Sequence, residues 1–176
     1  MKPIRIAISP CLVGRPIRYD GTDRRAVHVI ELLESYEIEL IPTCPEFAIG
    51  LGVPRPKIRH ELQPDGSVRL IMPERNRLDL TERMIAFVEN RVAALMELNL
   101  HGYIFKARSP SCGIDDVEVH RPDGQVLRNG SGFLTREILE RMPHLPVTDE
   151  QRLLDPATRD DWWRQVTAQV SKSKIA

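Results

Sequence analysis

Short apolar runs alternate along the chain with segments of helical periodicity, and this alternation limits the possible folds more than any other feature. The apolar runs cover 4–9, 38–41 and 102–107, and helical stripes of apolar residues cover 24–35 and the stretch from Asp79 to about Asn99. Short apolar strands that alternate with helices are typical of a parallel sheet covered on both faces. We therefore expect an α/β fold, with a single-domain, doubly wound, mostly parallel (Rossmann-like) sheet.

The rest of the chain adds smaller elements to this sheet. Two strands, at 59–63 and 68–72, flank the turn sequence PDGS and predict an inserted β-hairpin. After the strand at 102–107 we expect a turn-rich piece, a helix at 132–141, a short strand at 145–147 and a helix at 156–171. We assign residues 1–152 to the domain and residues 153–176 to a C-terminal helix that packs on it, with a frayed tail at 171–176.

The size and charge of the chain argue against several classes of protein. At 176 residues and 20.1 kDa, a single domain buries about 70% of the surface that its unfolded chain exposes. The 25 Lys and Arg balance the 25 Asp and Glu, which argues against binding nucleic acid mainly through phosphate contacts. No uncharged apolar stretch approaches a membrane span, and the N-terminal apolar run is too short for a signal peptide. We therefore expect a cytoplasmic protein that does not associate with membranes.

Each of the three predicted strands is followed by a cysteine, namely Cys11, Cys44 and Cys112. The carboxyl ends of parallel strands meet at one edge of a sheet, where such folds bind ligands, so we expect the three thiols to converge. An odd number fits neither a disulfide framework nor a site of four thiolates. Soft thiolates suit zinc or an iron–sulfur cluster, and three of them on a four-iron cluster would leave one iron free for a substrate atom. Three unrelated buried thiols are the alternative, because free cysteine is often buried.

The sequence around each cysteine carries a family resemblance. The three strings are SPCLVGRPIRYDG, CPEFAIGLGVPRP and KARSPSCG. Through them, residues 4–152 resemble the DUF523 (YbbK-type) family of small bacterial proteins, which is typified by thiouracil desulfidase. One departure is the segment FAIGLG, in which a glycine that the family commonly has is replaced. This departure concerns the loop after Cys44 rather than the cysteine itself.

The resemblance implies a cofactor and a reaction. The cofactor is a 4Fe-4S cluster held by Cys11, Cys44 and Cys112, with one iron not ligated by the protein. The reaction is desulfidation of a thiolated uracil, as 2- or 4-thiouracil or its nucleoside or nucleotide. It proceeds by non-redox, hydrolytic replacement of C=S by C=O with release of sulfide. Some relatives carry a further domain associated with RNA substrates, which this sequence does not include. We therefore expect a small thiolated pyrimidine rather than tRNA as the partner.

Candidate catalytic residues lie next to the cysteines. A water molecule that attacks the ring carbon needs a general base, and Glu46 is the first candidate because it lies two residues from Cys44. The alternative is that Glu46 only stabilises a helix N-terminus. We assign Ser109 to catalysis and Ser111 to substrate contact, with capping of a turn as the alternative for each. The other substrate-binding residues that we expect are Lys106, Arg18, Tyr19, Asp20 and Arg55, with bracing of Arg18 as the alternative for Asp20.

Cationic residues gather in and beside the three cysteine-bearing segments. They are Arg15, Arg18, Arg24, Arg25, Arg55, Lys57, Arg59, Lys106 and Arg108. On one face they would attract an anionic ligand such as a nucleotide phosphate, with Lys106 at a strand end as the favoured contact. The alternative is ordinary solvated charge, in which the arginines pair with Asp20, Asp23, Asp115 and Asp116.

Two further functions remain open from the sequence. The thiols could belong to a redox- or metal-sensing binding protein, or the chain could be a sulfur carrier that uses the open cluster iron. The sequence also leaves open whether the chain is a monomer or a homodimer. None of the five histidines pairs with another at metal-ligand spacing, so His60 in the hairpin is expected to be structural.

Overall fold

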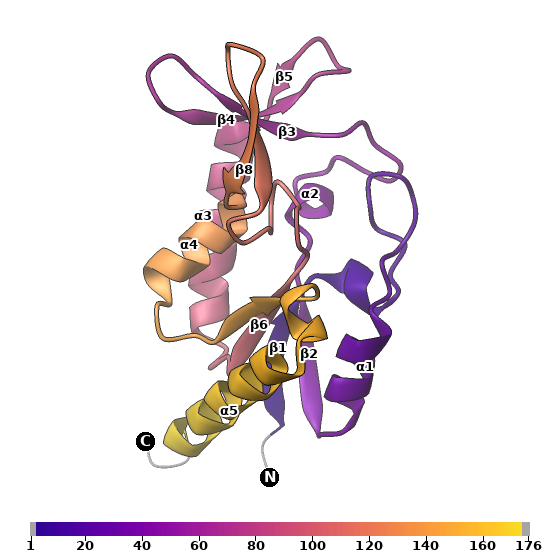
Figure 1. The fold of residues 1–176 in the computed structure, drawn as a ribbon, viewed down its shortest axis with the longest axis vertical. Coiled ribbons are helices and arrows are strands. Elements are labelled where there is room, and N and C mark those ends of the chain that lie inside the picture. The colour runs from indigo at the N-terminus through magenta and orange to yellow at the C-terminus, as the bar shows by residue number, and fades with distance from the viewer. Residues whose placement is uncertain (1–2, 174–176) are drawn as a thin grey trace.

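The computed structural model describes residues 3–173 and contains two β-sheets, one above the other in Figure 1. We call them the parallel sheet and the mixed sheet. The parallel sheet has the strand order β2 (Ile38–Pro42), β1 (Ile4–Ile8), β6 (Gly102–Phe105) and β9 (Val147–Asp149). All of its neighbouring strands pair in parallel, which confirms the expected α/β fold class.

Helices cover both faces of the parallel sheet because its strands bury side chains on both sides. Ile6, Ile8 and Ile104 pack with residues of α1 (Val27–Glu34) and α5 (Pro156–Ser173) in one core cluster. The intervening residues Ala7, Tyr103 and Phe105 pack with residues of α3 (Thr81–Met96) and α4 (Phe133–Arg141) in the other. Successive residues of a strand point to opposite faces, so this alternation places one helix pair on each side.

The mixed sheet contains the expected hairpin and extends it. Its order is β5 (Leu78–Asp79), β4 (Val68–Met72), β3 (Arg59–Leu62), β7 (Val117–His120) and β8 (Val126–Gly130). The hairpin of β3 and β4 is confirmed, and the turn-rich piece after residue 116 forms a second hairpin beside it. Side chains of β8 are almost all exposed, so this strand lacks the apolar alternation that identifies a strand in a sequence.

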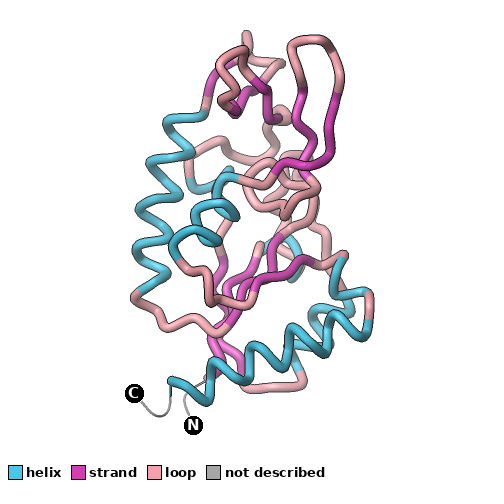
Figure 2. Tube along the Cα trace, turned by 60° about the vertical axis from the view of Figure 1, so that its left-hand side comes forward, coloured by secondary structure: helices cyan, strands magenta, loops and turns pink. Residues whose placement is uncertain are grey.

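The long helix α3 connects the two sheets. Its first residue lies beside the mixed sheet, where the backbone N–H of Leu70 donates to the Thr81 hydroxyl over 2.8 Å. Its sixteen residues correspond to a length of about 24 Å. Figure 2 shows this helix running along one side of the molecule toward the parallel sheet. Buried residues from both sheets therefore belong to a single core cluster along α3.

Several elements differ by a few residues from the sequence-based expectation. Helix α1 begins at Val27 instead of 24, and β9 lies two residues beyond the predicted strand at 145–147. Helix α5 continues to Ser173, so the first half of the tail predicted to be frayed is helical, and residues 174–176 lie outside the described residues. Among residues 3–173, no helix combines the length and apolar character that crossing a membrane requires.

Candidate active site

A cavity of about 820 Å³ opens at the carboxyl edge of the parallel sheet. Its walls come from the segments that follow β1, β2, β6 and β9, which is the edge where such sheets bind ligands. All three cysteines line it, together with six cationic side chains and three carboxylates. The convergence of the thiols that the sequence predicts is therefore present in the fold.

Each cysteine occupies the first turn after its strand. Cys11 lies in a 3₁₀ turn, Pro10–Val13, directly after β1. Cys44 is the N-cap residue of the short helix α2 (Pro45–Ala48), directly after β2. Cys112 lies in the turn after β6, where its backbone N–H and that of Gly113 both donate to the Ser109 carbonyl. Pro10 precedes Cys11 and Pro45 follows Cys44, and each proline begins the short helix that comes after its strand.

Burial keeps the three thiols protonated when no cation is bound. Burial, with a smaller contribution from Cys44, raises the pKa of Cys11 to about 11. Burial likewise raises the pKa of Cys44, and raises that of Cys112 well above its usual value with help from Cys44. These mutual effects indicate that the thiols share one electrostatic environment. A metal group bound here would have to displace the thiol protons, so its binding would be favoured by higher pH.

The spacing of the thiols does not fit a single metal ion. Within residues 3–173, no three His, Cys, Asp or Glu side chains lie close enough together to hold one. Thiolates on one zinc ion lie about 2.3 Å from the metal and hence close to one another. A cluster of several irons places each thiolate on a different iron atom, which allows wider separation. The donor set of three soft thiols around one cavity therefore fits an iron–sulfur cluster better than a mononuclear site.

The N-terminus of α4 anchors the turn that carries Cys112. The Cys112 carbonyl accepts from the Thr135 hydroxyl at 2.7 Å, and the Gly113 carbonyl accepts from the Gly132 N–H at 2.9 Å. A Cβ at position 132 would lie 2.3 Å from the backbone nitrogen of Cys112. Only glycine allows this close approach, so Gly132 is a site residue that the sequence did not identify.

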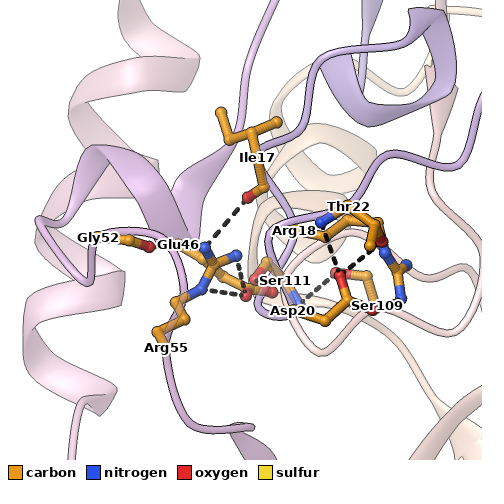
Figure 3. Close-up of polar contacts among 9 residues, drawn as sticks. All are labelled: Ile17, Arg18, Asp20, Thr22, Glu46, Gly52, Arg55, Ser109 and Ser111. Atoms are coloured by element: carbon orange, nitrogen blue, oxygen red, sulfur yellow. Dashed lines mark hydrogen bonds and ion pairs between the residues drawn. The ribbon is translucent and has the colours of Figure 1, made fainter.

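Glu46 lies in a network with two of the predicted site residues (Figure 3). Its Oε2 atom accepts from Nη2 and Nε of Arg55, at 2.7 and 3.0 Å. Its Oε1 atom accepts from the Ser111 hydroxyl at 2.9 Å. Two backbone carbonyls, of Ile17 and Gly52, hold the other end of the Arg55 guanidinium. The carboxylate is thus oriented by a buried cation and bonded to a hydroxyl at the cavity wall.

Ser109 has a different environment from Ser111, although both line the cavity. The Ser109 hydroxyl accepts from the backbone N–H of Ser111 at 3.2 Å, a contact that closes the turn. No described carboxylate accepts from the Ser109 hydroxyl, whereas the Ser111 hydroxyl is bonded to Glu46. The geometry therefore connects Ser111, rather than Ser109, to the candidate base.

The remaining predicted substrate-binding residues divide into two groups. Arg18 and Tyr19 line the cavity with Arg55, and the buried Nε of Arg18 has no hydrogen-bond partner among the described residues. Asp20 is outside the cavity lining of the described chain and accepts from Thr22 and Arg18 (Figure 3). The contacts of Asp20 thus correspond to the bracing alternative.

Lys106 lines the cavity, but its ammonium group is bonded within the protein. It donates to Oε1 of Glu150 over 2.5 Å and to the Ala107 carbonyl over 3.0 Å. Glu150 is buried and its second oxygen accepts from the backbone N–H of Ala107. Sequence reasoning missed Glu150, although it directly follows a strand of the parallel sheet. The predicted strand ended at 147, so the residue after Asp149 was not recognised as a strand end.

Three arginines at the cavity carry free positive charge. Arg24, Arg25 and Arg108 all line the cavity and are exposed. In the described part of the chain, none of them lies within ion-pair distance of a carboxylate. Asp23 and Asp116, two of the expected partners, accept instead from the backbone N–H groups of Arg25 and Arg108. The three other cations that line the cavity do pair with carboxylates: Arg18 with Asp20, Arg55 with Glu46 and Lys106 with Glu150.

Comparison with known proteins places the chain in a family. The model of a family described as 2-thiouracil desulfurase matches residues 6–150. The chain is also similar to a solved structure of the [4Fe-4S]-dependent thiouracil desulfidase TudS (DUF523Vcz), with 28% identity and a TM-score of 0.63. That similarity covers 85% of this chain and 93% of the other. No curated protein matches the chain.

Proposed function

The chain belongs to the 2-thiouracil desulfurase family, and from this premise we propose that it removes sulfur from a thiolated uracil by hydrolysis. The reaction replaces C=S by C=O, releases sulfide and requires no oxidant or reductant. One observation carries this proposal: a carboxylate and a hydroxyl, Glu46 and Ser111, are bonded to each other in the cavity that the three thiols line. A thiol-based sensor does not require such a pair beside its thiols, whereas a hydrolase does.

We propose that Cys11, Cys44 and Cys112 hold a 4Fe-4S cluster. The convergence of the three thiols on one cavity and the preference of iron–sulfur clusters for soft thiolate ligands support this assignment. When bound, the cluster would supply an iron without a protein ligand, a soft Lewis acid that binds a thiocarbonyl sulfur and withdraws electrons from the adjacent carbon. Arg18 and Tyr19 line the same cavity, and the buried Nε of Arg18, which has no hydrogen-bond partner among the described residues, is available to a pyrimidine ring bound there.

Glu46 acts as the general base in this proposal. The attacking water forms a bond to the ring carbon through its oxygen. One of its protons passes by way of the Ser111 hydroxyl to Glu46, and the other is transferred to the departing sulfur. The C–S bond breaks and its electron pair leaves with sulfide. Arg55 orients the carboxylate through two hydrogen bonds, and this pair keeps that orientation before substrate arrives. Ser109 remains a candidate for catalysis that the variants below test.

The substrate that the cavity supports best is a nucleotide. Arg24, Arg25 and Arg108 are unpaired at the same cavity, and arginine is well suited to phosphate. Lys106 is bonded to Glu150, so we propose that it orders the wall near Cys11 and that the three arginines take the phosphate. A free nucleotide rather than tRNA remains our prediction.

The test is a sulfide-release assay on protein reconstituted anaerobically with iron and sulfide. The substrates are 2- and 4-thiouracil, their nucleosides and their 5′-monophosphates. We expect one sulfide for each uracil product, with a kcat/KM for the preferred nucleotide at least about tenfold above that for its base. The variant R108Q should reduce that preference and leave turnover of the free base unchanged. Iron-loaded protein that releases sulfide from none of these compounds would refute the proposed function.

A further inference from the structure

His60, in the central strand of the mixed sheet, extends to the turn that carries the candidate catalytic serines. Its Nε2 atom lies 2.7 Å from the carbonyl oxygen of Pro110. A carbonyl oxygen only accepts, so Nε2 carries the proton and donates. The ring is buried, and burial, despite the bond to Pro110, lowers the pKa of His60 to about 4. At neutral pH the imidazole is therefore uncharged and fixed in one tautomer.

Neighbouring strands and α4 hold this imidazole from three sides. His60 pairs with Leu70 in β4 and with Val119 in β7, so its backbone is fixed by two strand ladders. Its ring meets Phe133 edge to face, with centroids 5.4 Å apart and an interplanar angle of 86°. Because the position of His60 is fixed by these contacts, its hydrogen bond can determine where the Pro110 carbonyl lies.

The two halves of the turn are anchored by different elements. Donors at residues 132, 134 and 135 of the α4 N-terminus hold the carbonyls of Gly113, Ser111 and Cys112. The Pro110 carbonyl has only a long contact with α4, 3.4 Å from the backbone nitrogen of Phe133. Its short bond is to His60. Residues 111–113 thus depend on α4 through their carbonyls and on Ser109 through their N–H groups, whereas the Ser109–Pro110 half depends on the mixed sheet.

We propose that His60 is a positioning residue that sets the Ser109–Pro110 half of the turn and thereby aims the Ser111 hydroxyl at Glu46. The inference rests on the proposed function and adds a role for the mixed sheet. The backbone N–H groups of Ser111, Cys112 and Gly113 all donate to atoms of Ser109. Movement of Pro110 would displace Ser109 first and loosen this set of bonds. Cys112 would keep its α4 donors, so retention of the cluster would be preserved.

The test compares H60M with H60Q. Methionine fills the volume but has no donor, whereas the glutamine amide reaches about as far as Nε2 and can donate to Pro110. For H60M we expect kcat to fall at least about thirtyfold, because small misplacements of catalytic groups are costly, with KM and iron content near wild type. H60Q should recover kcat to within about threefold of wild type, since it restores the bond.

A second readout does not depend on turnover. In the metal-free protein, we expect H60M to speed amide hydrogen exchange at Ser111, Cys112 and Gly113 by at least about tenfold, while the amides of β6 keep their protection. The matched control is H101M. His101 is also buried and accepts from the backbone N–H of Arg5, at the opposite, amino end of the parallel sheet. The H101M variant should leave both kcat and the amide hydrogen exchange of residues 111–113 unchanged.

The outcomes separate the two proposals. Wild-type protein without sulfide release would overturn the proposed function, while the exchange measurement would still test the positioning role. Active wild type with H60M at wild-type kcat and exchange would overturn the positioning role alone. Should H60M not fold, H60N replaces it, because its shorter amide does not reach Pro110. Equal losses in H60M and H101M would also overturn the inference.

Discussion

The two sheets contribute to the site in different ways. The parallel sheet ends in the three cysteines, Glu46 follows its β2 strand, and Ser111 follows its β6 strand. The mixed sheet carries no cysteine, and the imidazole of its His60 donates to a backbone carbonyl of the turn that carries Ser111 and Cys112. Reactive groups at the strand ends of one sheet are thus braced by the interior of another. The residues proposed to carry out the reaction and the residue proposed to position them thus lie on different sheets. Variants in the parallel sheet should therefore lose iron or the chemical step, whereas variants at His60 should lose rate with iron retained.

The largest effect should come from the cysteines of the parallel sheet. We expect C11S, C44S and C112S each to lose bound iron and to reduce sulfide release to background, because an iron then lacks its thiolate. Iron analysis and the absorbance of anaerobically reconstituted protein measure this. H60M in the mixed sheet should keep its iron. Full iron content in all three cysteine variants would contradict the assignment of the thiols.

The next largest effect should come from Glu46. We expect E46Q to lower kcat about a thousandfold with iron retained, because an amide cannot accept the proton of the attacking water. The matched control is E61Q in the mixed sheet. Glu61 is also a buried glutamate paired with arginines, Arg59 and Arg77, but it lies outside the cavity lining of the described residues. A similar loss in both variants would attribute the effect to the loss of a glutamate–arginine ion pair instead of to catalysis.

The two serines should differ in a way that the turn explains. Ser111 donates to Glu46, so we expect S111A to lower kcat about a hundredfold. The Ser109 hydroxyl accepts from the backbone N–H of Ser111 and, within residues 3–173, is bonded to no carboxylate, so S109A should cost less than about tenfold. Single-turnover rates of the two variants, at equal iron content, give this comparison. A larger loss in S109A would return the catalytic role to Ser109, as the sequence alone suggested.

The smallest effect concerns stability and belongs to the mixed sheet. The pKa of His60 is about 4 in the folded protein and 6.5 ordinarily, with burial as the main cause and the nearby Arg136 contributing. The unfolded chain therefore binds the proton first, and stability is lost as the pH falls from 6.5 toward 4. Between pH 7 and pH 5 we expect about 2 kcal/mol of this loss in wild type and none from this source in H60M. Denaturant titrations at both pH values measure it, and equal losses in the two proteins would contradict it.

The sequence predicts the parallel sheet and its site because the signals are local. Each cysteine directly follows an apolar strand, so the shared edge of Cys11, Cys44 and Cys112 follows from the fold class alone. Glu46 is recognisable for the same reason, since it lies two residues from Cys44. The motif around Arg55 indicates a site residue. Its contact with Glu46, however, depends on the conformation of the irregular loop after Cys44, which no sequence pattern specifies.

The mixed sheet is only partly predictable, because its pairing is long-range. The hairpin of β3 and β4 has a turn signal, but His60 in β3 also pairs in parallel with Val119 in β7, 59 residues further on. No local pattern shows this pairing, so His60 was interpreted as structural. Ser109 and Ser111 are equivalent in sequence terms, and only the contact with Glu46 distinguishes them. Asp20 was included because of its motif, whereas its exposed side chain bonds to Thr22.

The most direct test of the central claim is a single-turnover reaction in ¹⁸O-labelled water. Anaerobically reconstituted protein, with no added reductant or oxidant, is mixed with substoichiometric thiolated uracil nucleotide. The hydrolytic account predicts one ¹⁸O atom in each uracil product and one sulfide released for each product, with no label in unthiolated uracil nucleotide incubated alongside. Product without the label, or turnover only when an electron donor is added, would contradict it.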